Sequence, residues 1–176
     1  MDYGRLNREL EQRPDCGQLL FLPYLVGTNA PEFDADASGV FWGLRQEHDS
    51  FDMARAVMEG VAFLLRKNCQ SLARSGLPCR NILAVGGGTK SPLWCQLWAD
   101  ITGIPVHIPE EQEAACLGAA ILAAVDDGAY EDFAAAAHRC VRLQAVYTPR
   151  PSAALEAKYR RFCKLYEAAL AVSKDA

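Results

Sequence analysis

The sequence predicts an α/β domain, because short apolar runs of strand length alternate along the chain with longer segments of helical periodicity. The chain has 176 residues, which is enough for one domain with a hydrophobic core. No internal repeat, low-complexity linker or shift in composition divides the sequence. We therefore expect one domain over residues 1–176.

The N-terminal part predicts two strands joined by a long loop. Residues 1–17 are polar, with a helix as one expectation, and end in a loop at 14–17; Leu19–Leu22 follows as a short apolar run bounded by a proline. The stretch 27–39 is rich in Asn, Asp, Pro and Ser, which is typical of a loop. The second strand is expected over 40–44.

A long helix follows the second strand. Asp49 and Ser50 offer N-caps, apolar residues then recur at helical spacing, and Gly76 ends the helix. Arg55 and Glu59 lie one turn apart, so we expect a solvent-side ion pair between them.

The next strand, 82–85, runs directly into three glycines. Ser91 is the expected N-cap of the following helix, which has Pro92 at its first position and ends at Gly103. A strand is expected over 105–108.

Three helices complete the prediction, over 114–126, over 131–141 and after Pro149. The first of them is so apolar that we expect it to be buried. Its apolar run ends at Val125 and is too short to cross a bilayer, and the polar N-terminus lacks a signal-peptide core. We therefore expect no membrane partner.

Charge and cysteine usage narrow the class of protein further. The formal net charge is -4 and no dense Lys/Arg block is present, which argues against a nucleic-acid partner. The seven cysteines are odd in number and form no CxxC pair. We expect them to be buried free thiols in a reducing cytoplasm, and we expect no metal site.

The glycine turn Gly86-Gly87-Gly88 is the segment most typical of ligand binding. Backbone without side chains can approach a flat ligand closely, and the next helix points its N–H groups at the same crevice. The alternative is a tight connection without a ligand. No GK[ST] follows, which excludes a Walker loop, and Ser91 replaces the third glycine of a dinucleotide fingerprint.

The glycine turn and a second pattern earlier in the chain are similar to motifs of the FGGY carbohydrate kinases, and most of all to those of the xylulokinases. The turn and its flanks, VGGGTKSPLW at 85–94, look like the adenosine motif of that family. The pattern G-x-F-x-G-L at 39–44, followed after seven residues by D-M-x-x-A-V-M-E at 52–59, fits the family's C-terminal signature.

Two more segments agree with the same family in the same order. FLPYLVGTNAP at 21–31 is similar to FLPYLSGER-P, from which residues 28–30 depart. EAACLGAA at 113–120 resembles E-x-x-A-L-G-A-A, with Cys116 replacing an alanine. The resemblance therefore covers residues 18–170.

The resemblance implies a ribonuclease-H-like domain of the actin-like ATPase and sugar-kinase superfamily, here incomplete. Such kinases close two domains over a cleft: the first carries the sugar site, a phosphate loop and a catalytic aspartate, and the second carries another phosphate loop and the adenosine motif. Residues 1–176 then correspond to part of the C-terminal nucleotide-binding domain, with the N-terminal domain absent.

The resemblance also assigns roles to the residues of the turn. Gly87 and Gly88 would lie along adenine and ribose, and Gly86 would serve the backbone turn. Ser91 stands where relatives often have an asparagine facing adenine. We interpret Lys90 as a solvated charge, with a contact to phosphate or ribose as the alternative.

The implied activity is ATP-dependent phosphorylation of a sugar hydroxyl with Mg²⁺, and xylulose is the expected sugar. No residue of this chain is expected to be catalytic, because the family's aspartate lies in the first domain. We expect weak binding of ATP or ADP, no sugar-kinase turnover by the isolated chain, and association into a homodimer through exposed apolar helices. The alternative is a non-catalytic nucleotide-binding or assembly module derived from a kinase.

Overall fold

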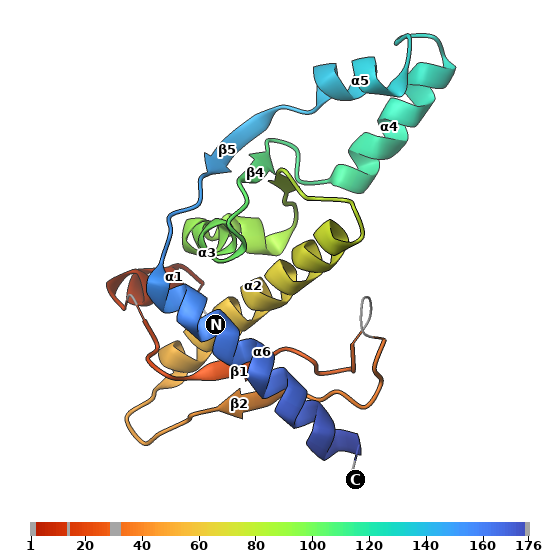
Figure 1. The fold of residues 1–176 in the computed structure, drawn as a ribbon. Coiled ribbons are helices and arrows are strands. Elements are labelled where there is room, and N and C mark those ends of the chain that lie inside the picture. Colours follow the sequence, from red (N-terminus) through yellow and green to blue (C-terminus); the bar gives the residue numbers. More distant parts are fainter. Residues whose placement is uncertain (1–2, 14, 29–32, 175–176) are drawn as a thin grey trace.

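The computed structural model describes residues 3–13, 15–28 and 33–174 and forms an α/β fold of helices around two small sheets (Figure 1). The elements in chain order are α1 (Tyr3–Gln12), β1 (Leu20–Leu22), β2 (Val40–Trp42), α2 (Ser50–Arg74), β3 (Ile82–Leu83), the 3₁₀ helix η1 (Gly87–Lys90), α3 (Pro92–Thr102), β4 (Val106–Pro109), α4 (Ala114–Asp126), α5 (Phe133–Cys140), β5 (Leu143–Tyr147) and α6 (Ala153–Lys174). Residues 29–31 of the FLPYLVGTNAP segment lie outside the described residues.

The strands form two separate sheets rather than one. β1 and β2 pair antiparallel, while β4 lies between a parallel β3 and an antiparallel β5. The α/β prediction is confirmed, but β5 is missing from the expected elements. Most β5 side chains are exposed and the strand lies at the edge of its sheet. Its sequence therefore lacks the alternation of apolar and polar residues that predicts a half-buried strand.

The predicted ends of α2 and α3 are confirmed. Asp49 caps α2 in a capping box, in which its side chain accepts from the Asp52 N–H and the Asp52 side chain accepts from the Asp49 N–H. Ser91 caps α3, and Gly103 ends it in the left-handed region at φ 72°.

The main core lies between α2, α3, α6 and β1. Phe63 of α2 and Phe162 of α6 are its largest fully buried members, and their ring centroids lie 5.4 Å apart. A Cβ at Gly60 would lie 2.3 Å from the carbonyl oxygen of Phe21, so only glycine lets α2 pack this closely against β1. This core fixes the position of α2 relative to α3.

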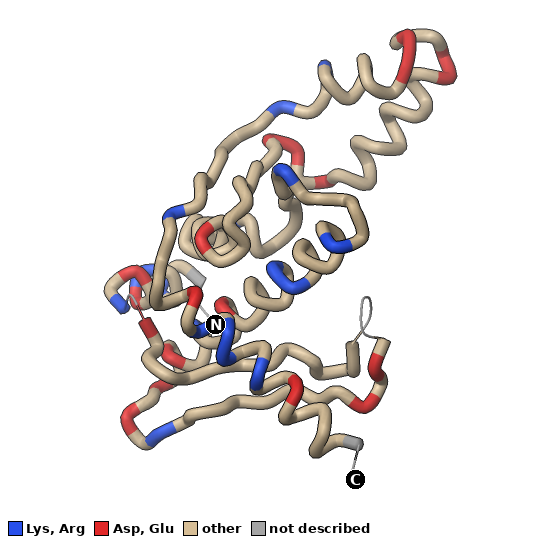
Figure 2. The backbone as a smooth tube through the Cα atoms, viewed as in Figure 1, with Lys and Arg blue, Asp and Glu red and all other residues tan. Residues whose placement is uncertain are grey.

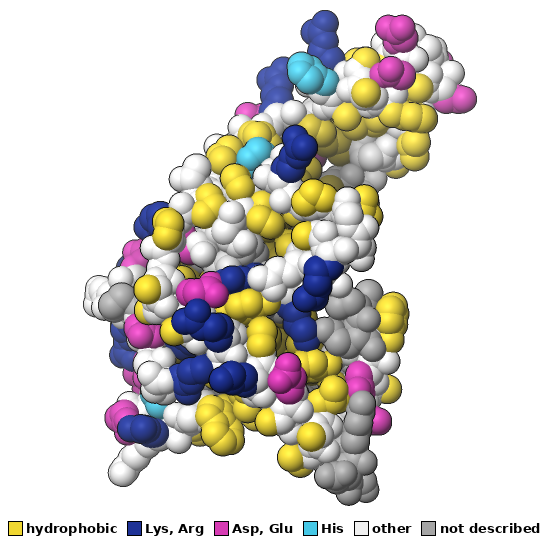
Figure 3. Space-filling view, in the orientation of Figure 1, with side chains coloured by type: hydrophobic (Ala, Val, Ile, Leu, Met, Phe, Trp, Pro, Cys, Tyr) yellow, Lys and Arg dark blue, Asp and Glu magenta, His cyan; other side chains and the backbone are white. Residues whose placement is uncertain are grey.

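The helix α4 is exposed, so the expectation of a buried helix is wrong. None of its described side chains is buried, and it packs against α5. The α4–α5 arm projects beyond the β3–β4–β5 sheet, carries acidic residues at its ends and exposes hydrophobic side chains (Figures 1, 2 and 3). A Cβ atom placed at Gly118 of α4 would have no other atom within 4 Å, so this glycine does not pack closely on the sheet.

All seven cysteines are free thiols, as expected, although their burial varies. Cys16, Cys69 and Cys95 are buried, whereas Cys116 on α4 is exposed. Among the described residues, no helix combines the length and apolar character needed to span a bilayer.

Candidate functional site

The predicted glycine turn connects β3 to α3, and its three glycines have different surroundings. Gly86 has φ 91°, a conformation that side-chain-bearing residues rarely adopt, and no atom lies near its built Cβ. A Cβ at Gly88 would lie 2.8 Å from the Trp98 ring. A Cβ atom placed at Gly87, whose φ is not positive, would have no other atom within 4 Å. Gly87 therefore leaves open space that neither backbone strain nor packing explains.

Hydrogen bonds hold the turn in place from two directions. The Thr89 hydroxyl lies 2.7 Å from the Gly86 carbonyl oxygen and 2.8 Å from Oε1 of Gln112, which follows β4. The indole N–H of Trp94 donates to the Met58 carbonyl of α2 at 3.2 Å. The turn is thus a fixed element between α2 and the loop after β4.

Ser91 makes two hydrogen bonds at the start of α3. Its Oγ accepts from the Trp94 N–H at 3.2 Å and donates to Oδ1 of Asn7, on α1, at 2.8 Å. The serine side chain therefore caps the helix and also connects α3 to α1.

A hollow of about 710 Å³ lies over this turn, between α1, α2 and the start of α3. The predicted site residues Gly87, Gly88 and Ser91 line it, whereas Gly86 does not. Its other lining residues are Leu6, Asn7, Ala54, Val57, Met58, Lys90 and Trp94. The volume is in the range of small-molecule pockets, and the combination of apolar walls with a few polar groups is typical of them.

The chemistry of this hollow suits an aromatic heterocycle that carries an anionic group. Val57, Met58 and Trp94 present apolar surface, while Asn7 and Ser91 contribute amide and hydroxyl groups. Lys90 is exposed at its edge, and the positive end of the α3 dipole faces the turn.

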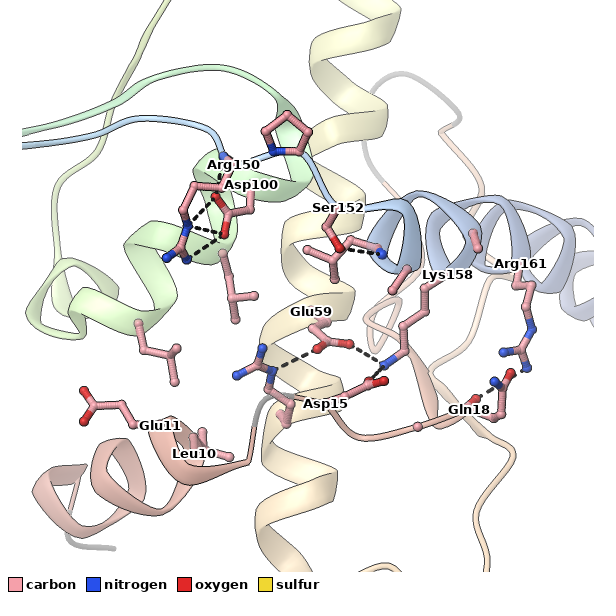
Figure 4. A pocket seen from close by; sticks show the side chains of 18 residues that line it. Leu10, Glu11, Asp15, Gln18, Glu59, Asp100, Arg150, Ser152, Lys158 and Arg161 are labelled. Atoms are coloured by element: carbon pink, nitrogen blue, oxygen red, sulfur yellow. Dashed lines mark hydrogen bonds and ion pairs between the residues drawn. The ribbon is translucent and has the colours of Figure 1, made fainter.

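A second hollow, of about 680 Å³, lies between α1, α2, α3 and α6 and contains a buried charge cluster (Figure 4). Glu59 is 2% exposed and accepts from Arg55 Nε at 2.9 Å and from Lys158 Nζ at 2.6 Å. Lys158 Nζ also lies 3.3 Å from Asp15 Oδ1 and 3.0 Å from Cys16 Sγ. The prediction of a solvent-side Arg55–Glu59 pair is therefore wrong: the pair exists, but Lys158 of α6 and the segment before β1 cover it.

The electrostatics of the cluster favour ion pairs over metal or ligand binding. Burial, together with the nearby Glu59 carboxylate, raises the pKa of the Cys16 thiol to about 11. Burial opposes the charge of Lys158, yet Glu59 and Cys16 outweigh this and leave the Lys158 pKa above its ordinary value. Asp15, Cys16 and Glu59 have ligand atoms within 4.8 Å of one another, but a protonated thiol and two adjacent cations oppose a metal ion there.

Sequence reasoning missed the residues of α1 and α2 that face the glycine turn. Asn7 lies 84 residues from Ser91 in the chain, and no motif connects them. Val57 and Met58 belong to the helical pattern and to the motif at 52–59, but neither pattern places them beside the glycine turn. A helical pattern identifies apolar faces, but it does not tell which of them lines a hollow.

Comparison with known proteins assigns the fold and the turn to one family. The profile of the FGGY family of carbohydrate kinases, C-terminal domain, matches residues 4–126. A xylulose kinase of Staphylococcus epidermidis is 32% identical over 163 residues, which cover 93% of this chain and 32% of that protein.

Two solved structures extend the similarity to three dimensions. The gluconate kinase of Lactobacillus acidophilus matches 99% of this chain and 35% of its own with a TM-score of 0.84 at 32% identity. Plasmodium falciparum glycerol kinase, solved with ADP, has the same fold with a TM-score of 0.80 at 22% identity, covering 98% of this chain and 34% of its own. The fold is that of the ribonuclease-H-like, actin-like ATPase and sugar-kinase class, and the chain spans about a third of the length of the curated relatives it matches.

Proposed function

The chain belongs to the FGGY family of carbohydrate kinases, and we propose that it supplies the adenosine-binding surface of an ATP-dependent carbohydrate kinase. The observation that carries this proposal is the open space over Gly87, which lines the hollow and has neither a positive φ nor a packing neighbour at its Cβ position. An empty volume beside glycine backbone, with apolar walls from α2 and α3, suits a flat purine.

In this proposal the residues of the turn divide the nucleotide between them. Adenine and ribose lie along Gly87 and Gly88, Ser91 at the start of α3 faces adenine, and Lys90 at the edge is a solvated charge, with a contact to phosphate or ribose as the alternative. Gly86 supplies the backbone bend that brings the next two glycines to the hollow.

Phosphoryl transfer needs positioned substrates, neutralisation of developing charge and a base for the attacking hydroxyl. Among the described residues that line the hollow, none carries a carboxylate that could act as the base, and the buried Glu59 of the second hollow is paired with Arg55 and Lys158. We therefore propose that Mg²⁺ and the acceptor sugar are held elsewhere in the complete kinase. The isolated chain then binds ATP or ADP without sugar-dependent turnover.

The proposed acceptor is a ketopentose such as xylulose, on the similarity to xylulose kinases of several bacteria. Seven free thiols favour a reducing cytoplasm as its compartment. We also propose that the chain associates into a homodimer, which light scattering tests.

Titration of the chain with ADP tests the proposal, using Gly87→Leu against the matched control Gly118→Leu. Neither glycine has a positive φ, and a Cβ placed at either would have no other atom within 4 Å, so we expect both variants to keep the fold, which circular dichroism checks. Only the leucine at position 87 fills the hollow. We expect Gly87→Leu to abolish ADP binding and Gly118→Leu to retain it; equal affinities for the two variants would refute the site.

A further inference from the structure

Asn7 is the residue of α1 that brings an amide to the hollow over the glycine turn. It is half-buried and lines the hollow together with Leu6 of α1 and with Gly87 and Gly88 of the turn. Its contact with Ser91 joins two segments that are 84 residues apart in the chain. A position on α1 thus contributes a polar group to a site that is otherwise built from α2, η1 and α3.

A short chain of hydrogen bonds fixes the orientation of this amide. The Trp94 N–H donates to Ser91 Oγ, and the Ser91 hydroxyl in turn donates to Asn7 Oδ1. The hydroxyl proton is therefore committed to the carbonyl oxygen of Asn7. Within the described part of the chain, the structure gives the Asn7 amino group no acceptor, so its two N–H donors stay available to a molecule in the hollow.

We propose that Asn7 selects adenine over other purines in this hollow, and that Ser91 is the positioning residue that holds its amide. The inference rests on the proposed nucleotide-binding function. An amide presents a donor and an acceptor side by side, and adenine presents the complementary pair, its N6 amino group beside a ring-nitrogen acceptor. The second lone pair of Oδ1 can accept from N6 while Nδ2 donates to the ring nitrogen.

The 6-oxo purines do not complement an amide held in this orientation. Hypoxanthine replaces the N6 donor with a carbonyl acceptor, which would face the Asn7 carbonyl oxygen. Rotation of the amide would exchange the hydrogen bond that the Ser91 hydroxyl donates for one in which Nδ2 donates to Ser91 Oγ, an atom that already accepts from the Trp94 N–H. The structure thus gives a physical reason for discrimination on the 6-position of the base.

Binding of ADP and IDP to the chain, measured by NMR chemical-shift titration, tests this inference. The two nucleotides differ only in the donor and acceptor pattern at positions 6 and 1 of the ring. We expect wild type to bind ADP about tenfold more tightly than IDP, because a mismatched amide leaves buried polar groups unpaired. This ratio requires no variant and therefore does not depend on whether any variant folds.

Asn7→Asp tests whether the Asn7 amide causes the preference for ADP over IDP. Aspartate has the same shape and still accepts from Ser91, but it lacks the amino donors. We expect ADP affinity to fall about tenfold and the ADP preference to disappear. If wild type binds both nucleotides equally, or Asn7→Asp retains the ADP preference, the role of Asn7 is refuted, while sensitivity of binding to Gly87→Leu still supports the nucleotide site. If wild type binds neither nucleotide, the site and the inference both fail.

Discussion

Neutralising Glu59 is expected to destabilise the fold strongly. The carboxylate is 2% exposed and receives Arg55 Nε at 2.9 Å and Lys158 Nζ at 2.6 Å. Glu59→Gln keeps the size of the side chain and one acceptor for Arg55. Among the described residues, it leaves the buried Lys158 ammonium with Asp15 as its one carboxylate partner, at 3.3 Å and with a side chain that is 59% exposed, beside the Cys16 thiol.

The magnitude follows from the cost of a buried charge that loses its partner. Breaking a buried ion pair from one side costs about 3–5 kcal/mol. A chain of this size loses about 2–4 °C in melting temperature per kcal/mol, so we expect a decrease of about 6–20 °C. Since whole domains are stable by only about 5–15 kcal/mol, urea denaturation followed by circular dichroism will resolve the effect readily.

Two further variants identify the mechanism. Glu113→Gln makes the same chemical change on the exposed N-cap of α4 and should cost no more than about 0.5 kcal/mol. Lys158→Met added to Glu59→Gln removes the stranded ammonium, so the double variant should lose less free energy of unfolding than the sum of the single variants. Equal stabilities for Glu59→Gln and Glu113→Gln, or strict additivity in the double variant, would refute the reasoning.

Three other outcomes can be measured on the same chain. The pKa of Cys16 is about 11 in the folded protein, above its ordinary value of 9.0. The protonated thiol therefore contributes fully to the free energy of unfolding below pH 9, and this contribution is lost as the pH rises towards 11. Urea denaturation from about pH 8 to 11 should therefore show a steeper loss for wild type than for Cys16→Ala; equal slopes would contradict it. Gly88→Ala should cost about 1–3 kcal/mol because its Cβ meets Trp98, whereas Gly87→Ala should stay within about 0.5 kcal/mol. Asp49→Ala removes the cap of α2 and should lower the free energy of unfolding by about 1 kcal/mol, measured by the same denaturation.

The parts of the fold that the sequence predicts well are those with local causes. The ends of α2 and α3 follow from Asp49, Ser91 and Gly103, each of which acts on backbone groups within a few residues. The glycine turn is predicted on the same grounds, because the requirement for glycine at Gly86 comes from its own φ.

The parts that the sequence does not predict depend on distant partners. The spacing of Arg55 and Glu59 places them together on α2, but the burial of that pair depends on Lys158, which is 99 residues beyond Glu59. Helix periodicity likewise predicts that α4 has apolar surface without identifying what contacts that surface. The amide of Asn7 meets the glycine turn only because the core fixes α1 and α3 relative to each other.

The glycine motif itself combines three separate physical requirements. Gly86 is required by backbone conformation, and Gly88 by the approach of the Trp98 ring, so both would be conserved in a tight connection that binds nothing. Gly87 meets neither requirement, and its missing side chain leaves the hollow open instead. A ligand site and a turn that binds nothing can therefore have the same three consecutive glycines in sequence. What distinguishes them is the effect of filling the space at position 87, which should remove nucleotide binding at little cost in stability, whereas a residue that serves only the turn would cost stability first.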